Sequence, residues 1–378
     1  MAKIFVCGDI INQFCHTQFI DPNFCKIISH CDYAIGNLEG VEAKEDCNIL
    51  EMQQVPGTIK NLKNAGFNLM LLANNHIADY GEDGLKRTIR LLKDNNIDYI
   101  GAGTTFSEAY AYKIVEIGRK KFAFLNICEA QAGYFQYKSQ KYGYAWLGHN
   151  MVESLIREAR KQADYLIVFV HAGLEHYQLP LRQFRLLYQH YCDLGASCVI
   201  ASHPHIVQGI ETFNNSIIAY SLGNFYFPRT PEADKFSDQE NEAFSIVLNF
   251  ENDVISYDII YHGITNGIVS IVEPSPKTNV VELSQKLTEP FYTNALNKQN
   301  IDAFTKVSRN LYWTAFNSAD AQISFLSKLK FLIRYIFFKE TAQKKYHRIS
   351  LFRHLNSNET YRFLNEDALC HKLKLKDK

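Results

Sequence analysis

Short apolar runs alternate with amphipathic segments over roughly the first 200 residues of this chain, and few folds accommodate such an alternation. Residues 166–170 are apolar at every position, which is typical of a strand that is covered on both faces of a sheet. In residues 83–95, Leu85, Ile89 and Leu92 fall on one face of a helix. Strands and helices that alternate in this way form layered structures. We therefore expect an α/β fold with a mixed sheet.

The same reasoning assigns the other elements. We expect strands at residues 3–6, 34–35, 68–72, 97–100, 122–127, 166–170 and 198–200, and a second helix at 181–194. The pattern then changes to antiparallel strands at 217–220, 244–250 and 254–261, with a polar surface loop at 227–240. Beyond about residue 273 the sequence is helical and mixed in charge, so we expect a main domain over 1–272 and a mostly helical extension over 273–378.

Composition excludes several classes of protein. The 40 basic residues balance the 40 acidic residues, so the net charge does not favour nucleic acid as a partner. The first residues enter a strand directly, without the basic and apolar regions of a signal peptide. The nine cysteines are scattered and form no CxxC pair, as in proteins with reduced thiols. We expect a cytoplasmic protein that binds no nucleic acid.

Polar side chains that can bind divalent cations follow the predicted strands. Ligands bind beside the carboxyl ends of strands in open α/β sheets, so these side chains are expected to meet there. A site for two metals needs carboxylate, imidazole and amide ligands from several strands, with positions left open for water and substrate. His76 adjoins this set as a candidate general acid, and Asp79 is close enough in sequence to orient it. The candidate ligands are Asp9, Glu39, Asn75, His171, His203 and His205.

Each of these residues also has an ordinary structural interpretation. Asp9 alone could cap a helix. Asn74 and Asn75 could form a turn, because asparagine tolerates the left-handed region. Glu39 and Glu175 could be solvated loop carboxylates. The coincidence of all these groups at strand ends favours a shared site.

Two local segments add detail to this site. Pro204 separates His203 from His205, and proline favours an extended conformation in the residue before it. We therefore expect a rigid, splayed pair of imidazoles that suits a metal or a phosphate. Residues 220–225 are expected to form a turn that lines the site, with Asn224 in contact either with a metal ligand or with substrate.

A series of short motifs runs through residues 3–262. They are Gly8-Asp9, Asn37-Leu38-Glu39-Gly40, Ala73-Asn74-Asn75-His76 with Asp79, Gly81 and Gly84, Gly101-Ala102-Gly103, His171-Ala172-Gly173-Leu174-Glu175, Leu194-Gly195-Ala196, Ser202-His203-Pro204-His205 and Ala219-Tyr220-Ser221-Leu222-Gly223-Asn224-Phe225. Together they resemble the CapA family of capsule and poly-γ-glutamate synthesis proteins, which belongs to the calcineurin-like metallophosphoesterase superfamily. Each motif is weak by itself, but the set in this order is specific.

The resemblance implies a metallophosphatase-like four-layer α/β/β/α sandwich with mixed sheets. It implies that two divalent ions, of manganese, iron, zinc or magnesium, are bound by the six candidate ligands. It makes His76 the catalytic histidine. From their places in the sequence we also expect Asn74, Glu175 and Asn224 near the substrate or the ligands, and the role of Glu175 as ligand, base or neither stays open. The implied reaction is hydrolysis of a phosphomonoester or phosphodiester, in which the cations acidify a water molecule and neutralise charge on the phosphoryl oxygens. The implied substrate is a phosphorylated or polymer-precursor molecule of capsule synthesis.

Two departures from the superfamily pattern leave other functions open. The first motif usually reads Asp-x-His, but Ile11 stands two residues after Asp9, so one metal could lack a ligand. The usual bridging aspartate is replaced by Asn37-Leu38-Glu39. One alternative is a non-catalytic accessory or binding protein of the capsule machinery. Another is metal-assisted chemistry on a γ-glutamyl amide.

Two further segments have open interpretations. The aromatic residues of 134–146 could stack on a sugar or a base, although such clusters more often serve packing. Residues 323–338 are apolar with three basic residues, and they are too short and too charged to span a bilayer. We expect them to pack on the protein or, with the basic residues that follow, to associate peripherally with the inner face of a membrane through 323–353. Proteins of the capsule machinery are further expected partners.

Overall fold

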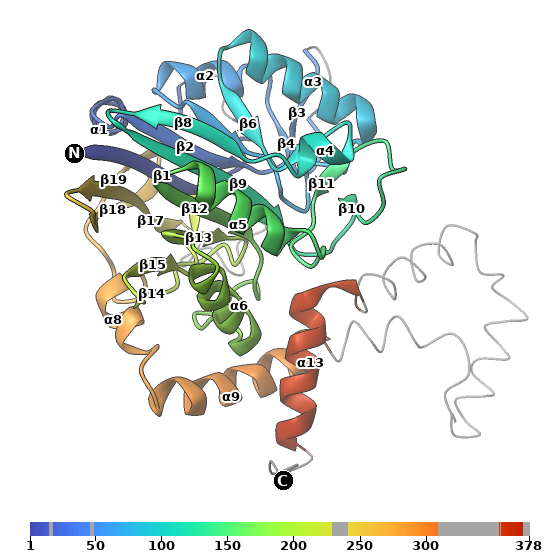
Figure 1. Ribbon diagram of the computed structural model, residues 1–378, viewed down its shortest axis with the longest axis vertical. Coiled ribbons are helices and arrows are strands. Elements are labelled where there is room, and N and C mark those ends of the chain that lie inside the picture. The colour runs from blue at the N-terminus through green and yellow to red at the C-terminus, as the bar shows by residue number, and fades with distance from the viewer. Residues whose placement is uncertain (15–17, 46–48, 229–240, 309–354, 356, 373–378) are drawn as a thin grey trace, which may run out of the picture. The chain divides into compact units, whose positions relative to one another are not determined.

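The computed structural model describes residues 1–14, 18–45, 49–228, 241–308, 355 and 357–372 (Figure 1). The chain separates into two compact units, residues 1–292 and 293–378, and each is described by itself. The predicted boundary after residue 272 remains a prediction. All candidate site residues belong to the first unit.

The larger sheet of the first unit has eight strands in the order β19-β18-β17-β1-β2-β5-β6, with β16 paired to β1 beyond the end of β17. Strand β1 runs parallel to β2, and antiparallel to β17. The sheet is therefore mixed, as expected. Its strands are β1 (Ala2–Ile10), β2 (Tyr33–Leu38), β5 (Leu69–Leu71), β6 (Asp98–Ile100), β16 (Asn224–Tyr226), β17 (Glu242–Glu251), β18 (Val254–Thr265) and β19 (Ile268–Ile271).

The smaller sheet has six strands in the order β14-β15-β13-β12-β9-β8. Strand β12 is parallel to both of its neighbours, β9 and β13, and every one of its residues is buried, as the apolar run predicts. The strands are β8 (Lys113–Ile117), β9 (Lys120–Cys128), β12 (Tyr165–His171), β13 (Cys198–Ser202), β14 (Ile210–Phe213) and β15 (Ser216–Ala219). Two short sheets, β3 (Val41–Glu42) with β4 (Gln53–Gln54) and β7 (Ala102–Gly103) with β10 (Tyr134–Phe135) and β11 (Gly143–Ala145), complete the strands.

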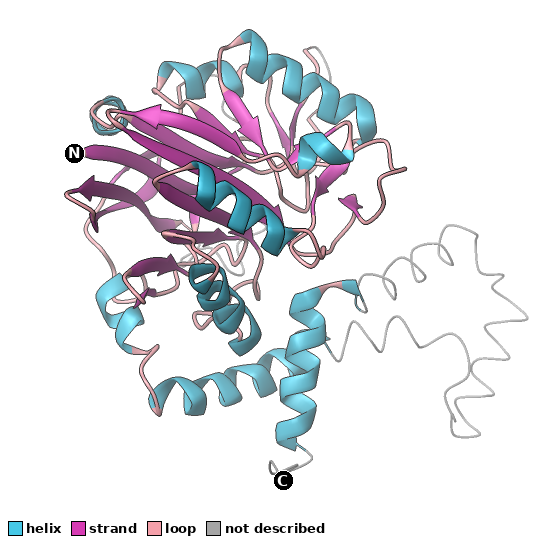
Figure 2. Cartoon of the chain, in the orientation of Figure 1, coloured by secondary structure: helices cyan, strands magenta, loops and turns pink. Residues whose placement is uncertain are grey.

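Strand β1 shows how the layers form. Side chains alternate between the two faces of a strand, so Ile4 and Val6 pack into the core between the two sheets. Phe5 and Cys7 enter a second core, which the larger sheet shares with helices α1, α2 and α3. Helices α5 and α6 contact the smaller sheet, on the side away from the larger one (Figure 2). The expected four-layer α/β/β/α sandwich is confirmed.

The helices of this unit follow ordinary local rules. Helix α1 has Pro22 at its first position, and the Asp21 carboxylate caps it by accepting from Asn23 N. Helix α3 has acidic residues in its first turn, where their negative charge interacts favourably with the positive end of the helix dipole. It buries Leu85, Ile89 and Leu92. The helices are α1 (Pro22–Ser29), α2 (Thr58–Asn64), α3 (Gly81–Asp94), α4 (Phe106–Ala109), α5 (Val152–Gln162), α6 (Arg182–Asp193) and α8 (Val280–Gln285).

Several sequence predictions need correction. Residues 217–220 were expected in an antiparallel strand, but β15 is parallel to β13 and antiparallel only to β14. The turn expected at 220–225 ends earlier, because Asn224 begins β16 and pairs with Asp9. Strands β8 and β14 and helices α1, α2 and α5 were not predicted. The surface loop expected at 227–240 lies almost wholly outside the described residues.

The second unit is helical where the structure describes it. Helix α9 (Phe291–Ala303) enters it and continues into a π-helical turn at Phe304–Ser308. Asn300 Nδ2 donates to Asp367 Oδ2 of helix α13 (Glu359–Lys372) over 3.0 Å. Among the described residues, no helix has the length and apolar character needed to cross a membrane. The segment expected to meet a membrane, 323–353, lies outside the described residues.

Candidate metal centre

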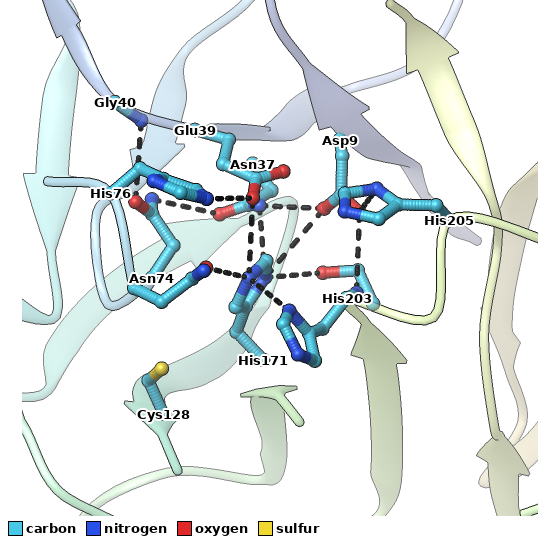
Figure 3. A network of polar contacts seen from close by, with 12 residues as sticks. Asp9, Asn37, Glu39, Gly40, Asn74, His76, Cys128, His171, His203 and His205 are labelled. Atoms are coloured by element: carbon cyan, nitrogen blue, oxygen red, sulfur yellow. Dashed lines mark hydrogen bonds and ion pairs between the residues drawn. The ribbon is translucent and has the colours of Figure 1, made fainter. Parts of the chain in front are cut away.

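The candidate site lies where the carboxyl ends of parallel strands from both sheets meet (Figure 3). Strand register brings these ends level: Asp9 pairs with Asn37 in the larger sheet, and His171 pairs with Ser202 in the smaller one. The structure places all six candidate ligands here, each at most 6% exposed: Asp9, Glu39, Asn75, His171, His203 and His205. Residues far apart in the sequence therefore share one buried cluster.

Asp9 is held by contacts on both carboxylate oxygens. Oδ1 accepts from Asn37 Nδ2 over 2.7 Å, and Oδ2 accepts from the backbone N–H of His203 over 3.2 Å. The end of β1 comes close to β16 because Gly8 has no side chain; a Cβ there would overlap the carbonyl oxygen of Gly223. Close packing of two glycines thus lets Asp9 lie between the sheets.

His171 is the centre of one group of candidate ligands. Its Nε2 lies 2.9 Å from Asn75 Oδ1, 3.1 Å from His203 Nδ1 and 3.6 Å from Glu39 Oε1. Two imidazole nitrogens that face each other at this distance can share a proton or turn their lone pairs towards a common cation. Histidine nitrogen with carboxylate and amide oxygen is a donor set that zinc, manganese or iron accepts.

A second group forms around His205. Its Nδ1 lies 3.5 Å from Asp9 Oδ2 and 2.9 Å from Asn224 Oδ1. Glu39, His203 and His205 each offer a ligand atom, and the three atoms lie within 4.8 Å of one another. The chemistry and spacing of the buried donors therefore fit divalent cations.

The backbone around Pro204 differs from the prediction. The residue before proline was expected to be extended, but His203 has φ +101° and His205 has φ +60°. Non-glycine residues rarely adopt positive φ, and they do so where surrounding contacts hold them. The hydrogen bond from His203 N to Asp9 is one such contact. The two imidazoles are splayed as expected, with ring centroids 5.9 Å apart, by a different backbone conformation.

The charges of the site shift its histidines in opposite directions. Burial lowers the pKa of His171 well below its usual value, and the neighbouring histidines lower it further. Burial also opposes charge on His203, but Glu129, Glu175 and Asp9 outweigh it and raise the pKa of His203 to about 9. Burial would raise the pKa of Glu175, yet the surrounding histidines lower it overall.

His76 lies at the open rim of the cluster. Its Nδ1 is 2.7 Å from Asp79 Oδ2, and its Nε2 is 3.9 Å from Glu39 Oε1. Its side chain is 27% exposed, so the ring is reachable from solvent, unlike the six candidate ligands. The structure brings His76 and Asp79 together as the sequence suggests.

The residues expected near substrate or ligands take different positions. Asn74 is buried and fixes the loop after β2, because it donates to Leu38 O over 2.9 Å and accepts from Gly40 N. Glu175 is half exposed, and its Oε1 lies 3.6 Å from His203 Nε2. Asn224 contacts His205 through its side-chain oxygen. The structure thus gives Asn74 contacts with the loop backbone.

Two further positions of the site are Glu129, which the sequence analysis missed, and Ile11, which it identified. Glu129 is fully buried and lies 3.4 Å from His203, yet it was not among the candidates. The signal was available, because it follows the apolar strand at 122–127 as the other ligands follow theirs. Ile11, at the place of the superfamily's histidine, is fully buried and donates its backbone N–H to Tyr226 O.

Comparisons with known proteins agree with the motifs. Residues 3–229 match the sequence model of a family described as bacterial capsule synthesis protein PGA_cap. The capsule biosynthesis protein CapA of Bacillus anthracis is 30% identical over 231 residues, covering 58% of this chain and 56% of that protein. The PGA biosynthesis protein CapA of Bacillus subtilis (strain 168) is 31% identical over 218 residues, covering 56% of each. The match thus spans about half the length of these relatives.

Solved structures resemble the chain at low sequence identity. A hypothetical protein from Thermus thermophilus is 15% identical with a TM-score of 0.44, covering 68% of this chain and 99% of that one. A 5'-nucleotidase precursor from the same organism is 10% identical with a TM-score of 0.40, covering 78% of this chain and 59% of that one.

Proposed function

This chain belongs to the bacterial capsule synthesis protein family, and from that membership and the buried donor cluster we propose that it is a metal-dependent hydrolase of phosphate esters in capsule or surface-polymer synthesis. Its substrate would be a phosphorylated molecule or polymer precursor. The relatives named CapA are described as capsule or PGA biosynthesis proteins, which supports the biological setting.

The convergence of the six ligands is the observation that carries this proposal. Carboxylates and imidazoles that lie at most 6% exposed are costly to desolvate unless they are paired or coordinate a cation. Asn75, His171 and His203 would hold one divalent cation, and Asp9 and His205 another, with Glu39 close to both groups. When bound, two such cations acidify water and neutralise charge on a phosphoryl group.

His76 would supply the proton of the reaction. Asp79 accepts from Nδ1–H, which leaves Nε2 directed at the donor cluster. A histidine in this position can hold a proton on Nε2 and transfer it to the oxygen of the leaving group. Asp79 would fix the orientation of the ring.

Ile11 supports a second candidate function. Because this buried side chain replaces a superfamily ligand, the site could bind a cation or a capsule component without turnover. The chain would then serve as an accessory protein of the capsule machinery. Metal-assisted cleavage of a γ-glutamyl amide would use the same donors, and it differs from the first proposal only in substrate.

The test compares the wild-type chain with His203→Ala/His205→Ala. We expect about two metals per wild-type chain by elemental analysis, and manganese-dependent hydrolysis of a phosphodiester. The double variant should lose both while keeping its circular dichroism spectrum. The matched control is His30→Ala/His190→Ala, which removes two exposed histidines outside the site.

The outcomes of this test distinguish the three proposed functions. Metal binding with no turnover of phosphate esters would reject the phosphoesterase proposal, and cleavage of a γ-glutamyl amide in the same samples would replace it. Neither metal nor turnover, even after manganese is supplied, would leave the accessory role.

A further inference from the structure

Glu129 is a buried carboxylate beside the donor cluster that the ligand set does not include. It follows directly after β9, and its side chain is only 1% exposed. Among the described residues, the group of acidic and histidine side chains spaced for a metal ion contains Glu39, His203 and His205, without Glu129. Its role therefore has to come from the side chains that it contacts.

The backbone of Glu129 is fixed on both sides. Its N–H donates to the carbonyl oxygen of His171 over 3.1 Å, which extends the pairing of β9 with β12. Its carbonyl oxygen accepts from the hydroxyl of Tyr144 over 3.0 Å. The same hydroxyl accepts from Gln131 N over 2.8 Å. Buried Tyr144 thus holds the turn at 129–131 in one conformation.

The side chain of Glu129 lies against one edge of the His203 ring. Glu129 Oε1 is 3.4 Å from His203 Nε2 and accepts from Gln131 Nε2 over 3.0 Å. Gln131 Nε2 also lies 3.4 Å from His203 Nε2, and its shorter contact is the one with the carboxylate. The other ring nitrogen, His203 Nδ1, is 3.1 Å from His171 Nε2. The imidazole therefore stands between a carboxylate on its Nε2 side and the ligand cluster on its Nδ1 side.

We propose that Glu129 is a positioning residue that keeps a proton on His203 Nε2, so that the Nδ1 lone pair is directed at the metal site. A neutral imidazole carries one proton, and the hydrogen bond of one nitrogen determines which nitrogen is free to bind metal. Carboxylates that orient ligand histidines in this way commonly change metal affinity by about 10–100-fold. This inference rests on the proposed metal site and adds a residue to its support.

Glu175 is the other carboxylate near His203 Nε2, and it suits this role less well. Its Oε1 is 3.6 Å away, and its side chain is 48% exposed, so solvent competes for the proton. Glu129 is closer and has a second fixed partner in Gln131. The difference in burial favours Glu129 as the residue that sets the tautomer.

The experiment titrates Mn²⁺ calorimetrically into the metal-free, full-length chain and its variants. Glu129→Ala should lower the affinity by about 10–100-fold, and Glu129→Gln, which keeps an acceptor for Nε2–H, should recover most of it. The matched control is Glu42→Gln, because Glu42 is also buried and accepts from Gly57 N and Ile59 N outside the site. It should bind Mn²⁺ like the wild type.

A second readout does not need metal. In the histidine ¹⁵N spectrum of the metal-free chain, recorded above pH 9 so that the wild-type ring is neutral, His203 should hold its proton on Nε2 in the wild type and populate the Nδ1–H tautomer in Glu129→Ala. An unchanged tautomer would overturn the inference, as would equal losses of affinity in Glu129→Ala and Glu42→Gln. If the wild type binds no Mn²⁺ but the tautomer shifts, the proposed metal site fails while the role of Glu129 stands.

Discussion

Two buried histidines, His203 in the donor cluster and His262 in the aromatic core, have pKa values that are shifted in opposite directions. His262 lies on β18 against the rings of Phe24 and Phe225, at centroid distances of 5.6 and 5.1 Å. Burial there lowers the pKa of His262 to about 3. At His203 the nearby carboxylates overcome the same penalty and raise the pKa to about 9. Burial alone keeps a histidine neutral, and the neighbouring carboxylates reverse that effect.

A single strand connects the two regions. Asn224 and Phe225 are consecutive residues of β16, so their side chains leave the strand on opposite faces. Asn224 contacts His205 in the donor cluster, whereas Phe225 stacks on Phe24 in the aromatic core. The polar site and the apolar core that supports it are therefore one residue apart.

The largest effect is expected at the rim of the polar region. His76→Asn should lower kcat of phosphodiester hydrolysis by about 10²–10⁴-fold, because the leaving oxygen loses its proton donor. The metal content should stay at the wild-type value, since His76 is not among the six candidate ligands. Steady-state kinetics and elemental analysis of the same sample check both points.

Asp79→Asn is the companion variant. It keeps the shape of the group beside His76 Nδ1 but removes its charge, so it should cost less activity than His76→Asn. Loss of metal in either variant would show that His76 belongs to the ligand set and would contradict its separate role as proton donor.

An intermediate effect is expected in the aromatic core and concerns pH. The pKa of His262 is about 3 in the folded chain and about 6.5 when unfolded, so the unfolded state binds more protons below pH 6.5. The contribution of neutral His262 to the free energy of unfolding is complete above pH 6.5 and is lost as the pH falls towards 3. The slope from this group is at most about 1.4 kcal/mol per pH unit. Urea unfolding at pH 6.5 and 4.5 should show a smaller loss in His262→Leu than in the wild type.

The control for this prediction is Mn²⁺ binding at the candidate metal site. His262→Leu should bind Mn²⁺ with wild-type affinity, because the ring that it removes faces the aromatic core. Equal losses of stability with falling pH in the variant and the wild type would mean that His262 is not neutral in the folded chain.

The smallest effect is expected from metal removal. A cation that binds only the folded chain stabilises it by about 1.4 kcal/mol at ten times its Kd. A chelator should therefore lower the Tm of the wild type and of His262→Leu by the same amount. It should leave the Tm of His203→Ala/His205→Ala unchanged. A shift in that variant would place the stabilising cation outside the described cluster.

Much of the fold could be predicted because burial leaves a clear mark in the sequence. The apolar run at 166–170 matches β12, and the helical face at 83–95 matches α3. Short strands at sheet edges were missed, since β8 alternates partly buried with exposed residues and resembles a loop. The partners of β15 could not be read from its composition, because parallel and antiparallel pairing bury the same side chains.

The candidate site was predictable for a related reason. Its ligands follow apolar strands, and parallel strands end at the same edge of a sheet. Glu129 was missed although it too follows an apolar strand, because its contact with His203 depends on tertiary packing of β9 beside β12. The backbone at His203 was predicted wrongly because a local preference before proline gave way to the hydrogen bond with Asp9.

The positive φ angles of His203 and His205 mean that these two residues lower the stability of the fold. Backbone of this kind costs about 1–3 kcal/mol for each non-glycine residue, whereas glycine adopts it freely. A lineage that no longer needed the imidazoles would gain stability by drifting to glycine at both positions. At these two positions the imidazoles of the candidate site and the stability of the fold therefore favour different residues.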